Sequence, residues 1–120
     1  MLKMLFFGLI LLCLSFQAVG YEKVDFYFHK ISLERGLSNS TVYSMTQDRN
    51  GNLWVGTSDG LNKYDGYHFS VYRHDATVAS SICSNQIRCV KMDGLGLLWI
   101  GTMQGLSFYD AQKNAFENYS

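Results

Sequence analysis

The sequence predicts an all-β fold, and three observations support this prediction. The 120 residues include 11 glycines, 8 tyrosines and 8 phenylalanines, a composition that favours short strands and tight turns. The segment 37–65 matches the segment 82–110 without a gap. No stretch shows the apolar period of an amphipathic helix of useful length. We therefore expect two copies of one small antiparallel sheet, and no helix longer than two turns after residue 24.

Charge and composition exclude two classes of protein. Ten basic residues balance ten acidic ones, which argues against a nucleic-acid binder because such proteins usually carry a strongly basic face. Charged residues make up 17% of the chain and aromatic residues 15%. The chain therefore has enough apolar surface to fold, unlike a disordered, highly charged chain.

The segment 1–20 predicts a signal peptide. Lys3 supplies a positive charge, Met4–Leu14 is an apolar run, and small residues at positions 18 and 20 have the spacing of a signal-peptidase site. We expect cleavage before Tyr21 and export of the chain to the periplasm. An uncleaved anchor is the less favoured alternative, because the run is shorter than the roughly 20 apolar residues that span a bilayer.

The internal repeat is the strongest signal in the chain, because it pairs residues one by one and places both tryptophans on equivalent positions. After the second paired aspartate the second copy gains two residues, so that Phe69 and Tyr72 correspond to Phe116 and Tyr119. We expect structural roles for the identical pairs. Apart from Leu53 and Leu98, these pairs are Asp48 and Asp93, Gly51 and Gly96, Trp54 and Trp99, Gly56 and Gly101, Thr57 and Thr102, Gly60 and Gly105, Leu61 and Leu106, Tyr64 and Tyr109, and Asp65 and Asp110.

Each repeat predicts a four-stranded antiparallel meander, over 41–72 and 86–119. In the first copy, tight turns rich in Asp, Asn, Ser and Gly separate the apolar runs. Its strands are expected at 41–47, 53–57, 61–64 and 68–72, with turns at 48–51, 58–60 and 65–66.

Both faces of these sheets are apolar, since Leu53 and Val55 point to one side and Trp54 to the other. Sheets of about 45 residues that need cover on both faces are typical of β-propeller blades. Gly56 and Gly101 lie inside strands and predict a close approach of another backbone. We assign 36–79 to one blade and 80–120 to a second. Propeller rings have four or more blades, so two blades form an incomplete propeller.

The segment 21–35 is expected to hold an extra strand at Val24–Ile31, followed by a linker. In an intact ring this strand could complete the last blade. Two blades alone leave two apolar faces uncovered, which is rare in a stable monomer. We therefore expect the isolated chain to be marginally stable or to self-associate.

The residues carry a family resemblance. The strings Gly36–Asn39, Gln47–Thr57 and Asp59–Gly66, with the lead-in Phe28–Ile31, resemble the two-component regulator propeller repeat. The resemblance covers nearly all of 26–119. In the second copy, Gly94-Leu95 replaces the polar turn and Ala111-Gln112-Lys113 replaces the Asp-Gly step. These departures lie in turns.

The resemblance implies a large periplasmic sensor of the hybrid histidine kinases found in Bacteroides-like bacteria. In that family many blades precede a β-sandwich, a membrane span and a kinase, and the ligands are oligosaccharides. The chain is then interpreted as the N-terminal piece of such a sensor, with further blades and a kinase as partners and an oligosaccharide as the possible ligand. Only a longer form would be tethered to the membrane.

Candidate chemical sites are weak in comparison. Asp48 with the turn after it resembles the start of a calcium loop, but Asp93 and its turn lack the oxygen ligands, so a plain turn is favoured. Trp54 and Trp99 could stack on sugars, yet their equivalent positions favour core packing. The sequence predicts no catalytic residues, no cofactor and no metal site, and it leaves the ligand-binding residues open.

The two cysteines after the leader, Cys83 and Cys89, could form a disulfide in an exported chain. A single pair is weak evidence, so unpaired thiols are favoured. Their spacing also disfavours a zinc site.

Two function classes remain. The favoured one is a ligand-sensing, non-enzymatic segment of a signalling receptor that does no signalling alone. The alternative is a secreted propeller enzyme or carbohydrate-binding protein, such as a polysaccharide lyase with a tyrosine or histidine base.

Overall fold

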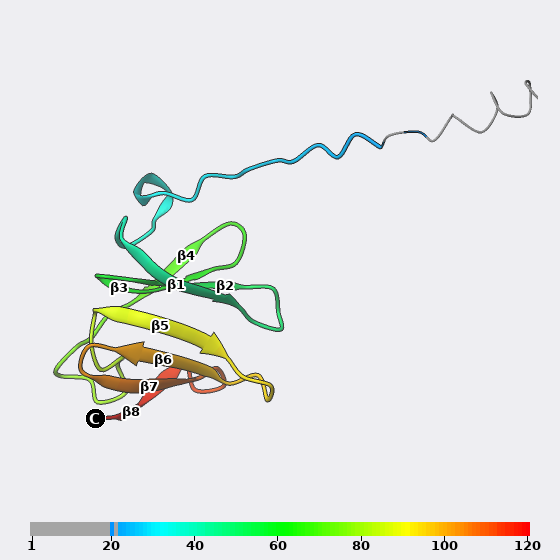
Figure 1. The fold of residues 1–120 in the computed structure, drawn as a ribbon. Coiled ribbons are helices and arrows are strands. Elements are labelled where there is room, and N and C mark those ends of the chain that lie inside the picture. The colour runs from blue at the N-terminus through cyan, green and yellow to red at the C-terminus, as the bar shows by residue number, and fades with distance from the viewer. Residues whose placement is uncertain (1–19, 21) are drawn as a thin grey trace, which may run out of the picture.

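The computed structural model describes residue 20 and residues 22–120. Apart from Gly20, the predicted signal peptide and its cleavage site lie outside the described residues. The described chain forms two four-stranded antiparallel sheets, each a simple meander, which confirms the predicted all-β fold (Figure 1). We call them blade 1 (36–79) and blade 2 (80–120).

Within each blade, every strand pairs with the next strand along the chain. The strand orders are β1-β2-β3-β4 and β5-β6-β7-β8. Short runs of β-branched and aromatic residues form the strands, and the tight turns expected from the sequence separate them. Blade 1 consists of β1 (Val42–Gln47), β2 (Leu53–Thr57), β3 (Gly60–Tyr64) and β4 (Phe69–Tyr72). Blade 2 consists of β5 (Ile87–Met92), β6 (Leu98–Thr102), β7 (Gly105–Asp110) and β8 (Ala115–Tyr119).

The two blades also share the same irregularities of the backbone. The register between β1 and β2 shifts between Val42 and Ser44, and the register between β5 and β6 shifts at the equivalent place, between Ile87 and Cys89. Gly51 and Gly96 close equivalent turns with φ angles of 84° and 81°. Only glycine adopts this left-handed conformation without strain, which explains why both copies keep it.

The two faces of each sheet have different partners. We call the side with Leu53, Val55 and Tyr64 the front face of blade 1, and the side with Trp54, Gly56 and Leu61 its back face. The equivalent front face of blade 2 carries Leu98, Ile100 and Tyr109, and its back face carries Trp99, Gly101 and Leu106.

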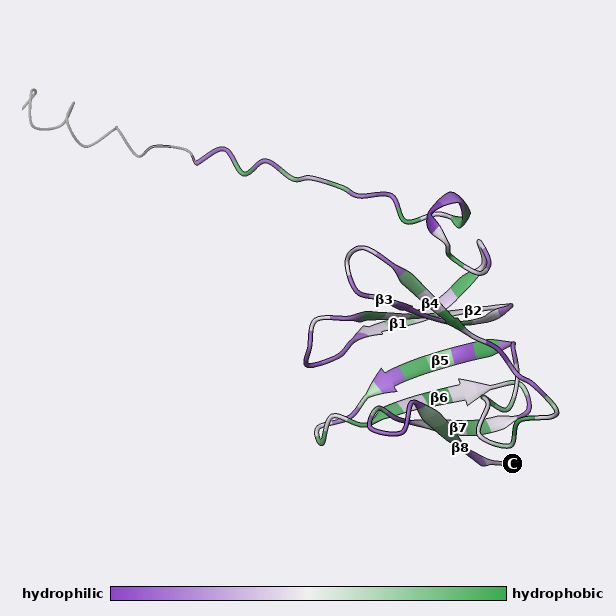
Figure 2. Cartoon of the chain, turned by 180° about the vertical axis from the view of Figure 1, so that it is seen from behind, coloured by the Kyte–Doolittle hydropathy of each residue, from purple (hydrophilic) through white to green (hydrophobic). Residues whose placement is uncertain are grey.

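The main core lies between the back face of blade 1 and the front face of blade 2. β5 lies against blade 1 and carries alternating hydrophobic and hydrophilic residues (Figures 1 and 2). Burial of this cluster supplies the main force that holds the two sheets together. The buried members are Trp54, Leu61, Ile82, Ile87, Val90, Leu98, Ile100, Tyr109 and Phe116.

One expected strand does not form. The segment 22–32 has no strand or helix, and Phe26, Tyr27 and Phe28 are exposed. A single 3₁₀ turn, Leu33–Arg35, leads into blade 1. The prediction of a strand at Val24–Ile31 is therefore wrong for this structure, because a strand needs a neighbouring edge to satisfy its N–H and C=O groups, and this segment has none beside it.

Cys83 and Cys89, the two cysteines among the described residues, are unpaired. The Cys83 sulfur lies 3.1 Å from Thr102 Oγ1 and 3.2 Å from the Ser107 hydroxyl oxygen. Cys89 is exposed on β5. The favoured interpretation as two free thiols holds in this structure, because Cys83 faces the strands of its own blade and Cys89 lies beside Gly101 on the back face.

Candidate functional site

The β1–β2 turn is organised by one carboxylate. Asp48 Oδ1 accepts the backbone N–H groups of Asn50 and Asn52 at 2.9 Å, and its Oδ2 accepts the Asn52 amide and the Trp54 indole N–H at 3.0 Å. Partial burial opposes ionisation of Asp48, but these donors outweigh it and lower the pKa of the carboxyl group. All of these contacts are internal to the turn, which is the structural role expected for Asp48.

Asp93 repeats this arrangement in blade 2. It accepts the backbone N–H groups of Leu95 and Leu97 and, at 2.9 Å, the indole N–H of Trp99. The hydrogen bond from Trp99 is the largest cause of the lowered pKa of Asp93. Among the described residues no group of three His, Cys, Asp or Glu side chains could hold a metal ion.

The paired threonines and the later aspartates also close turns. Thr57 Oγ1 donates to the Gly60 carbonyl at 2.9 Å, and Thr102 donates to the Gly105 carbonyl at the same distance. Asp65 accepts backbone N–H groups of residues 67 and 68, and Asp110 accepts those of residues 112 and 113. Each of these residues therefore shapes the backbone of its blade.

The two tryptophans have the same local geometry and different surroundings. Trp54 is buried against Tyr109 of blade 2, with 4.9 Å between the ring centroids, and the Lys63 ammonium lies 5.4 Å from the ring centre of Trp54. Trp99 is only half-buried and contacts Phe108 of its own blade. Trp54 is thus part of the core, whereas Trp99 lies on the back face of blade 2, which no other strand covers among the described residues.

Polar contacts fix the blades relative to one another. The Arg49 guanidinium donates to the Gly94 carbonyl at 2.7 Å, which joins the first turns of the two blades. The Tyr72 hydroxyl donates to Asn114 Oδ1 at 3.1 Å, and Tyr109 donates to the same oxygen at 2.8 Å. Burial, followed by the contact with Tyr109, raises the pKa of Tyr72, so that this hydroxyl stays protonated.

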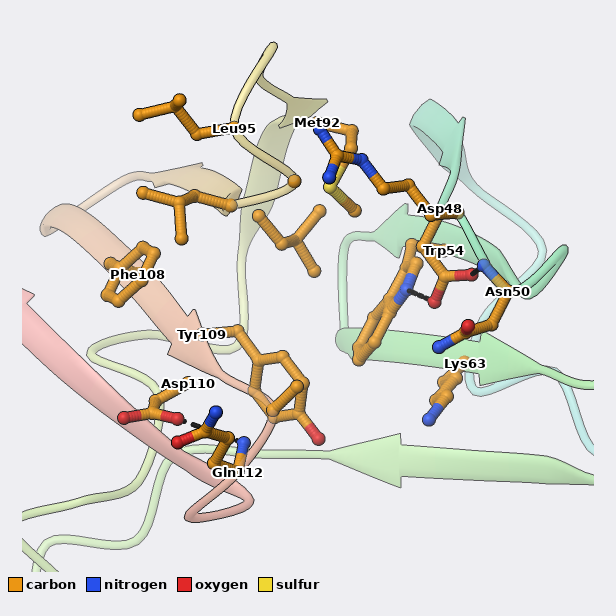
Figure 3. Close-up of a pocket in the computed structure, with 15 residues that line it drawn as sticks. Asp48, Asn50, Trp54, Lys63, Met92, Leu95, Phe108, Tyr109, Asp110 and Gln112 are labelled. Carbon is orange, nitrogen blue, oxygen red and sulfur yellow. Dashed lines mark hydrogen bonds between the residues drawn. The ribbon is translucent and has the colours of Figure 1, made fainter.

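A groove of about 490 Å³ opens at the edge of this interface and is the candidate ligand site (Figure 3). Blade 1 contributes the β1–β2 turn and the Trp54 and Lys63 side chains, and blade 2 contributes the β5–β6 turn, the C-terminal end of β7 and the turn after it. Its polar lining includes Asp48, Arg49, Asn50, Lys63, Asp110 and Gln112.

The groove combines buried aromatic rings with hydrogen-bonding groups at its rim. Trp54 and Tyr109 lie next to one another in its centre, while Asn50 and Gln112 come from opposite blades (Figure 3). Asn50 and Gln112 each offer an amide donor and an amide acceptor. Such a site offers hydrogen-bond donors and acceptors from both blades to a polar ligand.

Sequence reasoning identified Asp48, Trp54, Tyr109 and Asp110 as repeat residues, and the structure brings these four together in the lining of the groove. It did not identify Asn50, Lys63 or Gln112 as groove residues. Gln112 could have been found from the two additional residues that the second repeat has after Asp110, because the longer turn places Gln112 in the lining of the groove.

Comparison with known proteins places these features in a family context. Residues 36–59 and 81–104 match the profile of the two component regulator propeller. Over 70 residues the chain is 43% identical to Histidine kinase P4 of Formosa agariphila, a match that covers 57% of this chain and 5% of that protein.

Solved structures give the same result. The chain is similar to the extracellular domain described as hybrid two component system BT3049 from B. thetaiotaomicron, with a TM-score of 0.70, 36% identity, and coverage of 77% of this chain and 13% of that one. For the extracellular domain of BT4673 the TM-score is 0.56 at 27% identity, covering 66% of this chain and 11% of that one. The chain thus spans a small part of each relative. No helix in the described part of the chain has the length and apolar character needed to cross a membrane.

Proposed function

Since residues 36–59 and 81–104 are two-component regulator propeller repeats, we propose that the chain is part of the extracytoplasmic sensing region of a two-component signalling receptor. The observation that carries this proposal is the match to a bacterial extracellular domain at 36% identity, with a TM-score of 0.70 over 77% of the chain. The identity with a histidine kinase supports the same role. Further blades and a kinase are the partners that this role requires.

We further propose that the ligand is an oligosaccharide and that it binds in the groove between the blades. The supporting features are the amides of Asn50 and Gln112 at the rim of the groove and the buried Trp54 and Tyr109 rings beneath them. A ligand that contacts both amides would bridge the blades. The ligand would therefore increase the population of the arrangement in which the two blades are packed together. A shift of this kind would couple ligand binding to a distant output domain.

The signalling role is tested by sequencing the gene downstream of the Ser120 codon. In-frame blades followed by a histidine kinase are expected. A stop codon after a few more blades would contradict the receptor role and favour the secreted enzyme or binding protein.

The ligand is tested separately, by thermal melts of the purified chain with a panel of neutral oligosaccharides. At least one of them should raise the melting temperature, because a ligand that binds only the folded state stabilises it. Asn50→Ala and Gln112→Ala should remove the shift, whereas Gln104→Ala, an exposed residue in the β6–β7 turn, should keep it. No shift with any oligosaccharide, or equal shifts in all variants, would contradict the groove assignment and leave the receptor role standing.

A further inference from the structure

The groove between the blades holds a positive charge that has no ion-pair partner among the described residues. Lys63 lines the groove from β3 and is half-buried. The described residues form two ion pairs, Arg73–Asp59 and Lys113–Asp110, and Lys63 belongs to neither. A charge that is partly withdrawn from water gains from an ion of opposite sign.

We propose that the ligand of the groove is an acidic oligosaccharide, whose anionic substituent, a carboxylate or a sulfate, binds the Lys63 ammonium. This inference rests on the proposed ligand site in the groove and adds the charge of its ligand. It uses only residues of the two described blades.

Blade 2 shows that a blade does not need a lysine at this position. Lys63 pairs with Trp54 across β2 and β3. Its repeat counterpart, Phe108, pairs with Trp99 across β6 and β7. The Lys63 ammonium lies 5.4 Å from the Trp54 ring centre, and the ring centres of Phe108 and Trp99 are 5.3 Å apart. A phenylalanine ring thus occupies in blade 2 the place of the ammonium in blade 1, so packing alone does not require the charge.

The polar rim of the groove departs from the repeat in the same way. Asn50 has an apolar counterpart, Leu95, in the equivalent turn of blade 2. Gln112 lies in the turn that is two residues longer in blade 2, so it has no counterpart in blade 1. Asn50 and Lys63 come from blade 1, and Gln112 comes from blade 2 on the other side of the groove (Figure 3). The groove therefore collects polar groups at positions where the repeat does not demand them.

Two carboxylates also line the groove, and donors of the chain already occupy their oxygens. Asp48 accepts four hydrogen bonds, from its own turn and from the Trp54 indole. Asp110 accepts the backbone N–H groups of residues 112 and 113, and its Oδ2 lies 3.5 Å from the Lys113 ammonium. The negative charge of both carboxylates is therefore partly compensated within the chain.

The second cation of the lining, Arg49, is held by blade 2. Its guanidinium donates to the Gly94 carbonyl at 2.7 Å. It also lies directly over Gly96, because a Cβ atom there would be 3.1 Å from Arg49 Nε. Arg49 thus joins the blades, and Lys63 is the cation of the lining that is left for a ligand.

An anionic substituent adds one contact to those that any oligosaccharide can make with the amides of Asn50 and Gln112. Hydrogen bonds between ionised groups are stronger than those between neutral groups. An acidic oligosaccharide should therefore bind about tenfold more tightly than a neutral form of the same sugar. This preference should shrink at about 1 M salt, where the screening length falls to about 3 Å.

Isothermal titration calorimetry of the purified chain with matched pairs of oligosaccharides tests the proposal. One pair is an oligogalacturonate and its neutral methyl ester, and the other is a sulfated galactan oligosaccharide and its desulfated form. We expect the acidic member of at least one pair to bind about tenfold more tightly. The pair that shows this preference distinguishes a carboxylate from a sulfate.

The other outcomes separate this proposal from the proposed function. Binding of the neutral members that equals or exceeds binding of the acidic ones would overturn the acidic ligand and leave the groove assignment standing. Binding of none of the four probes would contradict both the acidic ligand and the groove assignment. Neither result bears on the receptor role, which the gene sequence tests.

Variants at position 63 assign the preference to this side chain. Lys63→Gln should remove the preference for the acidic member and keep the affinity for the neutral one, whereas Lys63→Arg should retain the preference. Lys63→Phe introduces the residue that blade 2 carries at this place, so the variant should fold normally and also lose the preference. Lys91→Gln makes the same change of charge at an exposed lysine of β5 outside the groove lining, and it should behave like the unchanged chain. An undiminished preference in Lys63→Gln would overturn the proposal.

Discussion

At the scale of single residues, the paired positions of the repeat could be predicted, and most of their contacts could not. Asp48 was expected in a tight turn, and the structure adds that it also accepts the Trp54 indole N–H. Asn62 was not singled out, although it is fully buried and binds the backbone N–H of Ser38 and the Val55 carbonyl. Its roles depend on a segment more than twenty residues away, so local patterns do not reveal them.

Blade 2 makes different hydrogen bonds at the position equivalent to Asn62. Ser107 replaces Asn62, and its hydroxyl donates to Asn118 Oδ1 at 2.6 Å. Asn118 in turn donates to the Ser81 carbonyl at 2.7 Å. The amide lies on the third strand of blade 1 (β3) and on the fourth strand of blade 2 (β8), which residue-by-residue alignment of the two copies does not show.

Acid should destabilise the chain through its turn aspartates. Asp48, Asp65, Asp75, Asp93 and Asp110 all have a lowered pKa in the folded state. A lowered folded pKa gives stability that is present above the unfolded value of about 3.9 and is lost as pH falls through the folded value. Urea unfolding should therefore give a constant free energy of unfolding from about pH 7 to pH 5 and a decline below pH 4.

Asp93→Asn tests the cause of this decline in stability at low pH, because asparagine keeps the shape of the aspartate side chain and does not ionise. This variant should be less stable at pH 7 and lose less stability between pH 5 and pH 3 than the unchanged chain. An equal loss in both proteins would contradict the role of Asp93.

At the scale of elements, the strands that pair with another strand were predicted closely. The strand expected at 24–31, which has no strand to pair with, was predicted wrongly. The expected strand at 53–57 matches β2, and the other expected strands of blade 1 differ from β1, β3 and β4 by one residue at an end. The segment at 24–31 has the composition of a strand and no edge to pair with. Strand formation depends on a neighbouring strand edge as well as on intrinsic propensity, and the sequence of the segment does not show whether such an edge is present.

Gly56→Ala should weaken the contact between the blades. The added methyl group would lie 2.5 Å from Ile87 Cγ2, so β5 must move away. Overpacking of this kind costs about 1–3 kcal/mol in the free energy of unfolding, measured by urea at low protein concentration. Gly101→Ala is the matched control and should change it by less than about 0.5 kcal/mol. Equal effects of the two variants would contradict the assigned packing of β5 on β2.

At the scale of the whole molecule, the repeat predicted the two blades, and the groove emerged only from the structure. Its rim residues Asn50 and Gln112 belong to different blades, and the groove exists because the blades pack in one orientation. Periodicity reveals equivalent positions, but it does not give the angle between sheets. Marginal stability or self-association of the isolated chain stays a prediction.

Export of the chain is also a whole-molecule prediction. The apolar run followed by small residues at positions 18 and 20 should direct cleavage before Tyr21. Mass spectrometry of the chain recovered from the periplasm should give a mature N-terminus at Tyr21. A mass that includes residues 1–20 would support the uncleaved anchor instead.

The nearest-neighbour order of the strands has a consequence for folding kinetics. Every strand pair joins segments adjacent along the chain, so most backbone pairing requires only short loops to close. Low contact order of this kind is associated with fast folding. When the N-terminal part of the chain emerges first, the hairpins of blade 1 can form before β5 is available, but their back face stays uncovered until Ile87 reaches Gly56. The slow step should then be the docking of one finished meander on the next, and variants at Gly56 should alter the folding rate more than variants in the turns.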